Sequence, residues 1–474
     1  MKRIILFIQI IVSLLSIVAC NDNDSFSESK SNILSFSSDT IKMDTVFSKV
    51  PSSTRSFWIY NNSGDGIRVA SIKLEKGNQT GFRVNIDGTD LTSRGYQTSN
   101  VEIRKGDSIR VFVELTSGYT NELEPKKLED NLACLLESGV TQKVNLNAWS
   151  WDATVMRNSE IKGDTTLSSE KPIIVYGILK VDSNATLGIS AGTSIFFHDS
   201  AGIDVYGTLK SIGDIGKFIT LRGDRLDNML EYLPYNMVSG QWRGIHIYSS
   251  SVNNEIGFTD IHSSEYGIEC DSASTYNSRL NMYNSIIHNC KGNGLTLYNC
   301  KANIENCQIS NALGDCVAIY GGNVSIMNTT IAQFYPFDSE RGVALRFANK
   351  YNEWNYALSS LRVTNSIITG YSDDELMGER DNKDIDFNYN FDHCLICTPN
   401  IDNDKSMSNI IWEAPDSINA QDKNFKIIDT KNLRYDFRLN SQSKAINAGI
   451  ANSLIYDLNG KKRDDTPDLG CYEY

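Results

Sequence analysis

The densest group of side chains with metal-binding chemistry is an acidic run near residue 375. Asp373, Asp374 and Glu375 are consecutive, and a mixed stretch of charges follows them: Glu379, Arg380, Asp381, Lys383, Asp384 and Asp386. Carboxylates are Ca²⁺ ligands, and a Ca²⁺ beside a Lys or Arg base would neutralise a uronate and acidify its C–H bond. Consecutive carboxylates in one loop do not converge as carboxylates from stacked strands do. A solvated acidic loop is therefore the preferred interpretation of these weak metal candidates.

A second candidate site is aromatic. The stretch between Phe334 and Leu361 carries Tyr335, Phe337, Phe347, Tyr351, Trp354 and Tyr356, with Arg341, Arg346 and Lys350. Aromatic faces with polar neighbours suit stacking on sugar rings. The candidate binding residues are therefore Tyr335, Tyr351, Trp354, Tyr356, Arg341 and Arg346. The alternative is a loop that packs its aromatic rings on the body of the protein.

Histidines supply two weaker candidates. His262 follows Ile261 and His288 follows Ile287, so the two imidazoles are expected to stack. Two imidazoles alone rarely hold a metal, and a surface ladder is the preferred interpretation. His246 and Glu269 also take equivalent outward positions, as an exposed pair would. No catalytic residue can be assigned, because no nucleophile elbow, P-loop or dinucleotide fingerprint is present.

The elements that would position these residues are repeats. Asn284, Asn306 and Asn328 recur every 22 residues. Each is followed by a small residue and then by two residues of which at least the second is apolar, and Asn365 and His393 continue this pattern. A second column interleaves with them, beginning at 244, 267, 294, 316 and 342. A fixed period with short alternating strands and no helical stretch indicates a solenoid made of strands. The register predicts that Asn306 and Ile309 lie on inward columns.

The N-terminus reads as a processing signal. Lys2 and Arg3 precede an apolar run that ends in Ala19 and Cys20. This resembles the lipobox of bacterial lipoproteins, which implies a signal peptide over 1–19 and lipidation of Cys20. The tract 20–34 is expected to be a flexible tether, and its acidic start resembles the signal that sends some lipoproteins to the outer face of the outer membrane. Residues 35–153 alternate with period 2 in several short runs, which predicts an immunoglobulin-like β-sandwich.

The region from 165 to 474 resembles a known family. The near-copies Val175–Lys180 and Val205–Lys210 flank a segment similar to the entry rungs of right-handed parallel β-helix proteins. The ending, from Leu439 to Tyr474, is similar to that of bacterial surface β-helix proteins. The chain thus resembles bacterial surface lipoproteins of the right-handed parallel β-helix repeat family, most of which lack an assigned activity. The implied architecture is all-β: a sandwich, a parallel β-helix over 165–430, and a closing segment over 431–474.

Composition narrows the function classes. The net charge is −13, with 45 Lys+Arg against 58 Asp+Glu, so a nucleic-acid partner is not expected. The cysteines after Cys20 are odd in number and are spread through the repeats, so they do not indicate a disulfide framework. Cys394 and Cys397 have no second pair of ligands nearby in the sequence, so a zinc site is not expected.

Three functions stay open. The leading one is a lipid-anchored, cell-surface protein that binds a glycan or surface polymer, with the membrane reached through its anchor. The second is a polysaccharide lyase or hydrolase, and the third a passive adhesive or structural stalk. No cofactor is expected, except Ca²⁺ under the lyase alternative. Convergent carboxylates with a basic residue on neighbouring rungs would favour the enzyme, and solvent-facing aromatic residues would favour binding.

Overall fold

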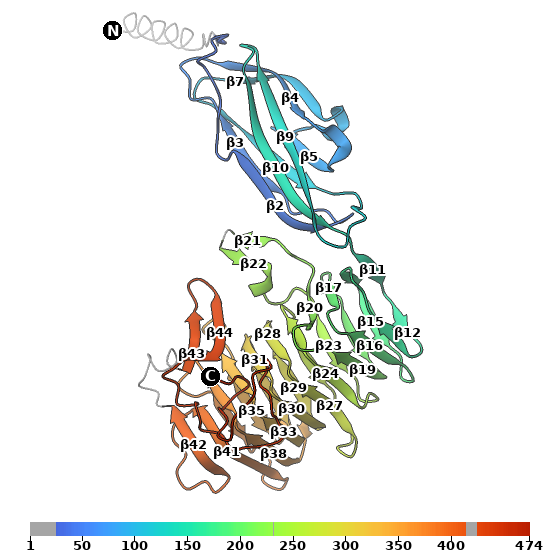
Figure 1. Ribbon diagram of the computed structural model, residues 1–474, viewed down its shortest axis with the longest axis vertical. Coiled ribbons are helices and arrows are strands. Elements are labelled where there is room, and N and C mark those ends of the chain that lie inside the picture. Colours follow the sequence, from blue (N-terminus) through green and yellow to red (C-terminus); the bar gives the residue numbers. More distant parts are fainter. Residues whose placement is uncertain (1–24, 231, 414–423) are drawn as a thin grey trace, which may run out of the picture. The chain divides into compact units, whose positions relative to one another are not determined.

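The computed structural model describes residues 25–230, 232–413 and 424–474. The predicted signal peptide and the lipidation site Cys20 lie outside these residues. The chain divides into two compact units, one ending at Asp152 and one spanning Ala153–Tyr474 (Figure 1). Among the described residues, no helix is long and apolar enough to cross a membrane.

The first unit is a sandwich of two five-stranded sheets. One sheet consists of β1 (Ser35–Phe36), β3 (Arg55–Tyr60), β8 (Ser108–Leu115), β5 (Phe82–Ile86) and β6 (Thr89–Asp90). The other consists of β2 (Thr40–Phe47), β10 (Thr141–Trp151), β9 (Lys126–Leu136), β4 (Ile67–Leu74) and β7 (Gln97–Ile103). Alternate residues, such as Val111 and Val113 on β8, are fully buried between the sheets. Two short 3-10 helices, η1 (Gly77–Gln79) and η2 (Thr92–Arg94), lie in its loops.

The second unit is a coil of parallel strands whose rungs each contribute up to three strands. The first ladder is β13 (Thr165–Leu167), β16 (Thr186–Ser190), β19 (Thr208–Ile212), β24 (Asn254–Gly257), β27 (Ser278–Tyr283), β30 (Lys301–Glu305), β33 (Gly322–Met327) and β38 (Leu358–Thr364). The second is β11 (Thr154–Arg157), β14 (Ile173–Tyr176), β17 (Ser194–Phe197), β20 (Ile219–Gly223), β25 (Thr259–His262), β28 (Ile286–Cys290), β31 (Gln308–Ala312), β34 (Thr330–Gln333) and β39 (Ile367–Gly370). The long strands β41 (Phe387–Cys397) and β42 (Met407–Glu413) extend both ladders, which together form one nineteen-stranded sheet.

A separate nine-stranded sheet forms the remaining ladder. It consists of β12 (Glu160–Ile161), β15 (Ile178–Val181), β18 (Gly202–Val205), β23 (Gly244–Ile247), β26 (Ile268–Cys270), β29 (Leu295–Tyr298), β32 (Val317–Tyr320), β35 (Leu345–Ala348) and β40 (Leu376–Glu379). Antiparallel pairs leave the coil at β21 (Asn228–Leu230) with β22 (Leu233–Pro234), β36 (Lys350–Tyr351) with β37 (Trp354–Asn355), and β43 (Phe425–Asp429) with β44 (Arg434–Leu439). The 3-10 helix η3 (Tyr235–Met237) follows β22. The fold class is thus the all-β one predicted, a parallel β-helix preceded by a β-sandwich.

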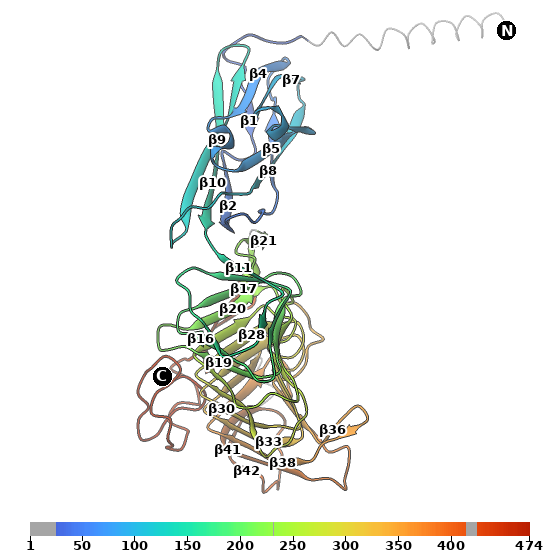
Figure 2. The same ribbon diagram turned by 90° about the vertical axis from the view of Figure 1, so that its right-hand side faces the viewer.

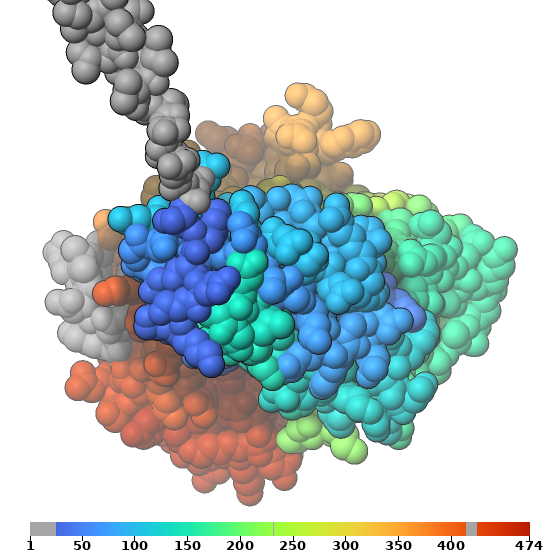
Figure 3. Space-filling view, turned by 90° about the horizontal axis from the view of Figure 1, so that it is seen from above, coloured from blue at the N-terminus to red at the C-terminus, as the bar shows by residue number. Residues whose placement is uncertain are grey.

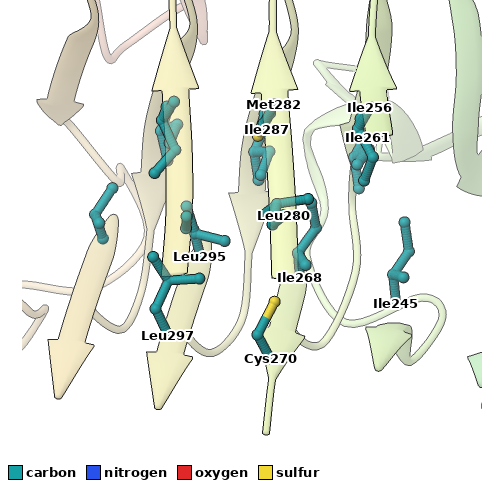
Figure 4. Packing of buried hydrophobic residues seen from close by; sticks show 14 of the residues in the cluster. Ile245, Ile256, Ile261, Ile268, Cys270, Leu280, Met282, Ile287, Leu295 and Leu297 are labelled. Carbon is teal, nitrogen blue, oxygen red and sulfur yellow. The ribbon is translucent and has the colours of Figure 1, made fainter. Parts of the chain in front are cut away.

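Side chains that point inward stack from rung to rung to form the core. Ile287 pairs with Ile309, and Ile309 with Ile331, in successive strands, and all three are buried. Figure 4 shows Ile261 and Ile287 on neighbouring rungs, with Leu295 and Leu297 of the nine-stranded sheet nearby. The 22-residue register therefore predicts the core column of Ile309 correctly. The described cysteines are free and buried, so they fill core positions.

The recurring asparagines form a bend and not an inward column. Asn284, Asn306, Asn328 and Asn365 all have positive φ, between 46° and 57°, at the corner between the two ladders of the nineteen-stranded sheet. Asparagine tolerates this left-handed conformation because its side chain bonds locally. Asn306 is buried, but the inward placement predicted for it is wrong. Its amide donates to the Tyr456 carbonyl (3.1 Å) and accepts from Arg463 Nη2 (2.8 Å), so the C-terminal segment covers it.

Strand pairing moves two boundaries from those expected. The coil begins at β11, ahead of residue 165, because Thr154–Arg157 already pairs in parallel with β14. The last parallel strand of the coil among the described residues is β42, which ends before residue 430. The next strands, β43 and β44, pair with each other as an antiparallel hairpin. In Figure 1 this hairpin stands beside β28 and β31.

Candidate functional site

The outer face of the nine-stranded sheet gathers the polar and aromatic side chains that the core excludes. Strand residues alternate between faces, so each residue between two inward apolar ones points outward. One outward column, in register, contains Asp204, His246, Glu269, Thr296, Ala318 and Arg346. The next column, two residues further along each strand, contains Tyr206, Tyr248, Asp271, Tyr298 and Tyr320.

A histidine sits between two carboxylates on this face. His246 Nε2 lies 2.9 Å from Asp271 Oδ1 and 3.9 Å from Glu269 Oε1. Burial opposes protonation of His246, but the hydrogen bond and charge of Asp271 outweigh it and raise the pKa of the imidazole. Burial raises the pKa of Glu269, against the attraction of His246. The exposed pair expected from sequence is thus a half-buried cluster with Asp271 as a third member.

Aromatic stacks flank this cluster. The rings of Tyr206 and Tyr248 stack with centroids 4.0 Å apart, and His246 stacks on Tyr248 at 4.1 Å. Further along the coil, Tyr298 and Tyr320 stack at 5.4 Å. Asp271 takes the intervening place in the tyrosine column, so the column consists of two stacks separated by a carboxylate.

A second ion cluster lies beside the later stack. Arg346 Nε is 2.6 Å from Asp315 Oδ2, and its Nη1 is 2.8 Å from Glu379 Oε1. Despite its burial, these two carboxylates raise the pKa of the Arg346 guanidinium. Tyr351 tilts over Tyr298 and Tyr320, with ring centroids 4.9 and 4.5 Å away.

The structure separates the six candidate binding residues. Tyr351, on β36, lies over the Tyr298 and Tyr320 rings, and Arg346 lies in the ion cluster beside them. Tyr356 is half-buried beside Gly321, and Trp354 is 68% exposed in the β36–β37 hairpin, which projects from the coil in Figure 2 and is light orange in Figure 3. Trp354 is thus the candidate whose ring is most open to a ligand.

Tyr335 and Arg341 lie elsewhere. Tyr335 is buried. Its hydroxyl is hydrogen-bonded to Ser239 Oγ (2.9 Å), and its ring packs edge-on against Phe337. The guanidinium of Arg341 lies over the Tyr371 ring, 4.7 Å from its centroid. These two residues follow the packing alternative and do not join Tyr351 and Arg346.

The acidic run does not converge. Asp373 and Asp374 are exposed, whereas Glu375 is fully buried and accepts hydrogen bonds from the Ser372 and Ala344 amides (2.7 and 2.9 Å). Burial raises the pKa of Glu375 to about 8. Within the part of the chain that the structure describes, the clusters whose possible ligand atoms lie within 4.8 Å of one another are two other groups, Asp260–His262–His288 and His246–Glu269–Asp271. A Ca²⁺ site at 373–375 therefore has no geometric support.

The stacking of His262 and His288 is confirmed, with ring centroids 4.5 Å apart and planes within 19°. The surface ladder is wrong, because His262 is only 6% exposed. Sequence reasoning missed Asp260, although a residue two positions before His262 in a strand shares its face. Burial lowers the pKa of His262 to about 4, even though Asp260 is beside it.

Cys394 and Cys397 are buried, and burial raises the pKa of both thiols to about 12. This is what we expect of cysteines that pack in the core.

No family model and no curated protein matches the sequence. Among solved structures, a protein of unknown function from Porphyromonas gingivalis W83 is 8% identical with a TM-score of 0.19, and the match covers 27% of this chain and 50% of that one. This chain thus spans half the length of that protein. The pectate lyase Pel9A is 13% identical with a TM-score of 0.27, covering 68% and 88% of the two chains. Dex49A from Penicillium minioluteum is 9% identical with a TM-score of 0.21, covering 78% and 77%. At these scores the likenesses carry no argument about function, and the fold assignment rests on the strand pairing.

Proposed function

We propose that this protein binds a glycan along the outer face of the nine-stranded sheet, while a lipid on Cys20 anchors it to the outer membrane, exposed at the cell surface. The observation that carries the proposal is the paired tyrosine stacks with ion clusters beside them on one sheet face. The C–H faces of sugar rings pack on aromatic rings, and sugar hydroxyls bond to charged side chains. Equivalent side chains recur from rung to rung along this face, so the face could bind several units of a polymer in a row.

A glycan array probed with the purified chain tests this proposal. We expect binding to a limited set of polysaccharides, and loss of at least tenfold in affinity for Tyr298→Ala. Tyr276→Ala serves as the matched control, because Tyr276 is 87% exposed outside the tyrosine column. Binding that Tyr298→Ala and Tyr276→Ala weaken equally would refute the assignment to this face. An array without any bound glycan would favour the stalk.

A lyase or hydrolase is the second candidate, and the His246 cluster favours it. Glu269, with a raised pKa, and the carboxylate of Asp271 lie two residues apart on one rung and resemble an acid and its partner, with His246 on the neighbouring rung. Incubation with neutral and acidic polysaccharides, followed by assay of reducing ends and unsaturated products, tests the activity. Release of product that Glu269→Gln abolishes would support the enzyme. Binding without any product would leave the cluster as part of a binding face.

A further inference from the structure

A second cluster, on the other sheet, has the composition of a metal site. Asp260 and His262 lie two residues apart on β25, so both point out of the same face. His288 on β28 pairs in register with His262, one rung further along. The fold therefore brings one carboxylate and two imidazoles together from adjacent strands.

Two distances within the cluster are close to those around a tetrahedral ion. Asp260 Oδ1 lies 3.1 Å from His262 Nδ1 and 3.3 Å from His288 Nε2. An ion held at about 2.0–2.1 Å from nitrogen and oxygen ligands places neighbouring ligand atoms about 3.3 Å apart. Both separations are close to that edge length, and the two ring nitrogens lie within 4.8 Å of each other.

A groove of about 460 Å³ reaches the cluster. Asp260 and His288 form part of one wall with Gln308, and the β43–β44 hairpin supplies Arg434 and Asp436 opposite, with Tyr472 at the side. The Tyr472 hydroxyl donates to Gln308 Oε1 at 2.7 Å, which ties the C-terminal segment to the coil. A small molecule in this groove would have direct access to the two ligands that line it.

Two neighbouring charged side chains, Arg222 and Asp436, bond to groups outside the cluster in the described structure. Arg222 precedes His262 by one rung, but its guanidinium donates to the Gly223 and Arg225 carbonyls (3.2 and 2.7 Å). Asp436 pairs with Arg438 at 2.5 Å. Neither contact involves Asp260, His262 or His288.

We propose that Asp260, His262 and His288 form a site for a tetrahedral Zn²⁺ ion, with its fourth position open to the groove. Two imidazoles and one carboxylate are a known ligand set of Zn²⁺ sites. Three protein ligands and an open fourth position are typical of sites that bind a water or substrate on the metal. This site is on a different sheet from the proposed glycan face and does not depend on that function.

Zn²⁺ titration of the purified chain, made without a polyhistidine tag and stripped with EDTA, tests the site. We expect one equivalent to bind, and Co²⁺ to give the intense visible absorption of a tetrahedral complex. His288→Gln should weaken Zn²⁺ binding by at least about 100-fold, since even outer-shell changes cost 10–100-fold. Asp260→Asn is a second variant that keeps the side-chain volume, and circular dichroism shows whether each variant is folded.

Two control variants separate this site from others. His198→Gln removes another imidazole paired with an aspartate, Asp224 (2.7 Å), but no second histidine joins that pair in the described structure. His246→Gln removes the histidine of the other three-residue cluster. Both should bind Zn²⁺ as the unmodified chain does. Absence of saturable binding, an octahedral Co²⁺ spectrum, or a loss seen with His246→Gln and not with folded His288→Gln or Asp260→Asn would overturn the proposal.

Discussion

The contact between the asparagine bend and the C-terminal segment predicts a measurable coupling between Asn306 and Arg463. Arg463 is buried, and its Nη2 donates to Asn306 Oδ1 at 2.8 Å. Its Nη1 also pairs with Glu473 at 3.0 Å. Replacing Asn306 with Gly removes the hydrogen-bonding amide but keeps the backbone at the positive φ of 57°, which Gly adopts without strain.

The expected magnitude follows from the bonds lost. A hydrogen bond to a charged group contributes about 1.5–3 kcal/mol, and a neutral one about 1 kcal/mol. Asn306→Gly also loses its bonds to Asn284 and the Tyr456 carbonyl, so we expect about 3–5 kcal/mol of destabilisation in all. Arg463→Met should be as harmful, because it leaves the Glu473 carboxylate, whose side chain is only 6% exposed, without its cation.

Urea unfolding of the two single variants and the double variant isolates the pair. We expect a coupling energy of about 1.5–3 kcal/mol between Asn306→Gly and Arg463→Met, because the double variant loses the shared bond only once. Asn365→Gly is the matched control from the same column, since its amide bonds to Ile450 and not to Arg463. Its effect should add to that of Arg463→Met within about 0.5 kcal/mol. Full additivity for Asn306 as well would refute the reasoning.

Four other predictions test separate parts of the account. Ile309→Asp should cost several kcal/mol of unfolding free energy, since it buries an unpaired charge, and an unchanged melting temperature would contradict the register. The pKa of His246 is raised in the folded state, so its contribution to stability is present below the unfolded pKa of about 6.5 and is lost as the pH rises through the folded pKa. Melting curves recorded across this pH range should lose that dependence in His246→Gln. Trp354→Ala should leave stability unchanged, because the ring is 68% exposed, and should reduce glycan affinity; unchanged affinity would exclude the hairpin from the binding face. Cys20→Ala should release the protein from membranes and abolish acyl labelling, and a variant still in the membrane fraction would count against the anchor.

The repeat register could be predicted from sequence because period and face determine most positions in a parallel coil. Ile309 followed from the 22-residue spacing, and the stacking of His262 on His288 followed from their equivalent places after Ile261 and Ile287. The role of Asn306 did not follow, because its partner Arg463 is 157 residues away and belongs to a segment outside the repeats. Spacing identifies which residues share a column, but not what covers that column.

The candidate sites were harder to predict for a similar reason. The aromatic stretch is continuous in sequence, yet Tyr335 packs on Ser239 while Tyr351 packs on Tyr298. Their separation depends on the path of the chain between two rungs, which composition does not encode. The His246 cluster needed Asp271, whose place in the tyrosine column becomes visible only when neighbouring strands are aligned.

Hydrogen–deuterium exchange on the purified chain with its best array glycan tests the central claim most directly. Glycan binding along the nine-stranded sheet predicts slower exchange in peptides that cover β23, β26, β29, β32 and β35, with little change in β3 and β8 of the sandwich. Protection confined to the sandwich unit, or to the nineteen-stranded sheet, would contradict the proposed binding face.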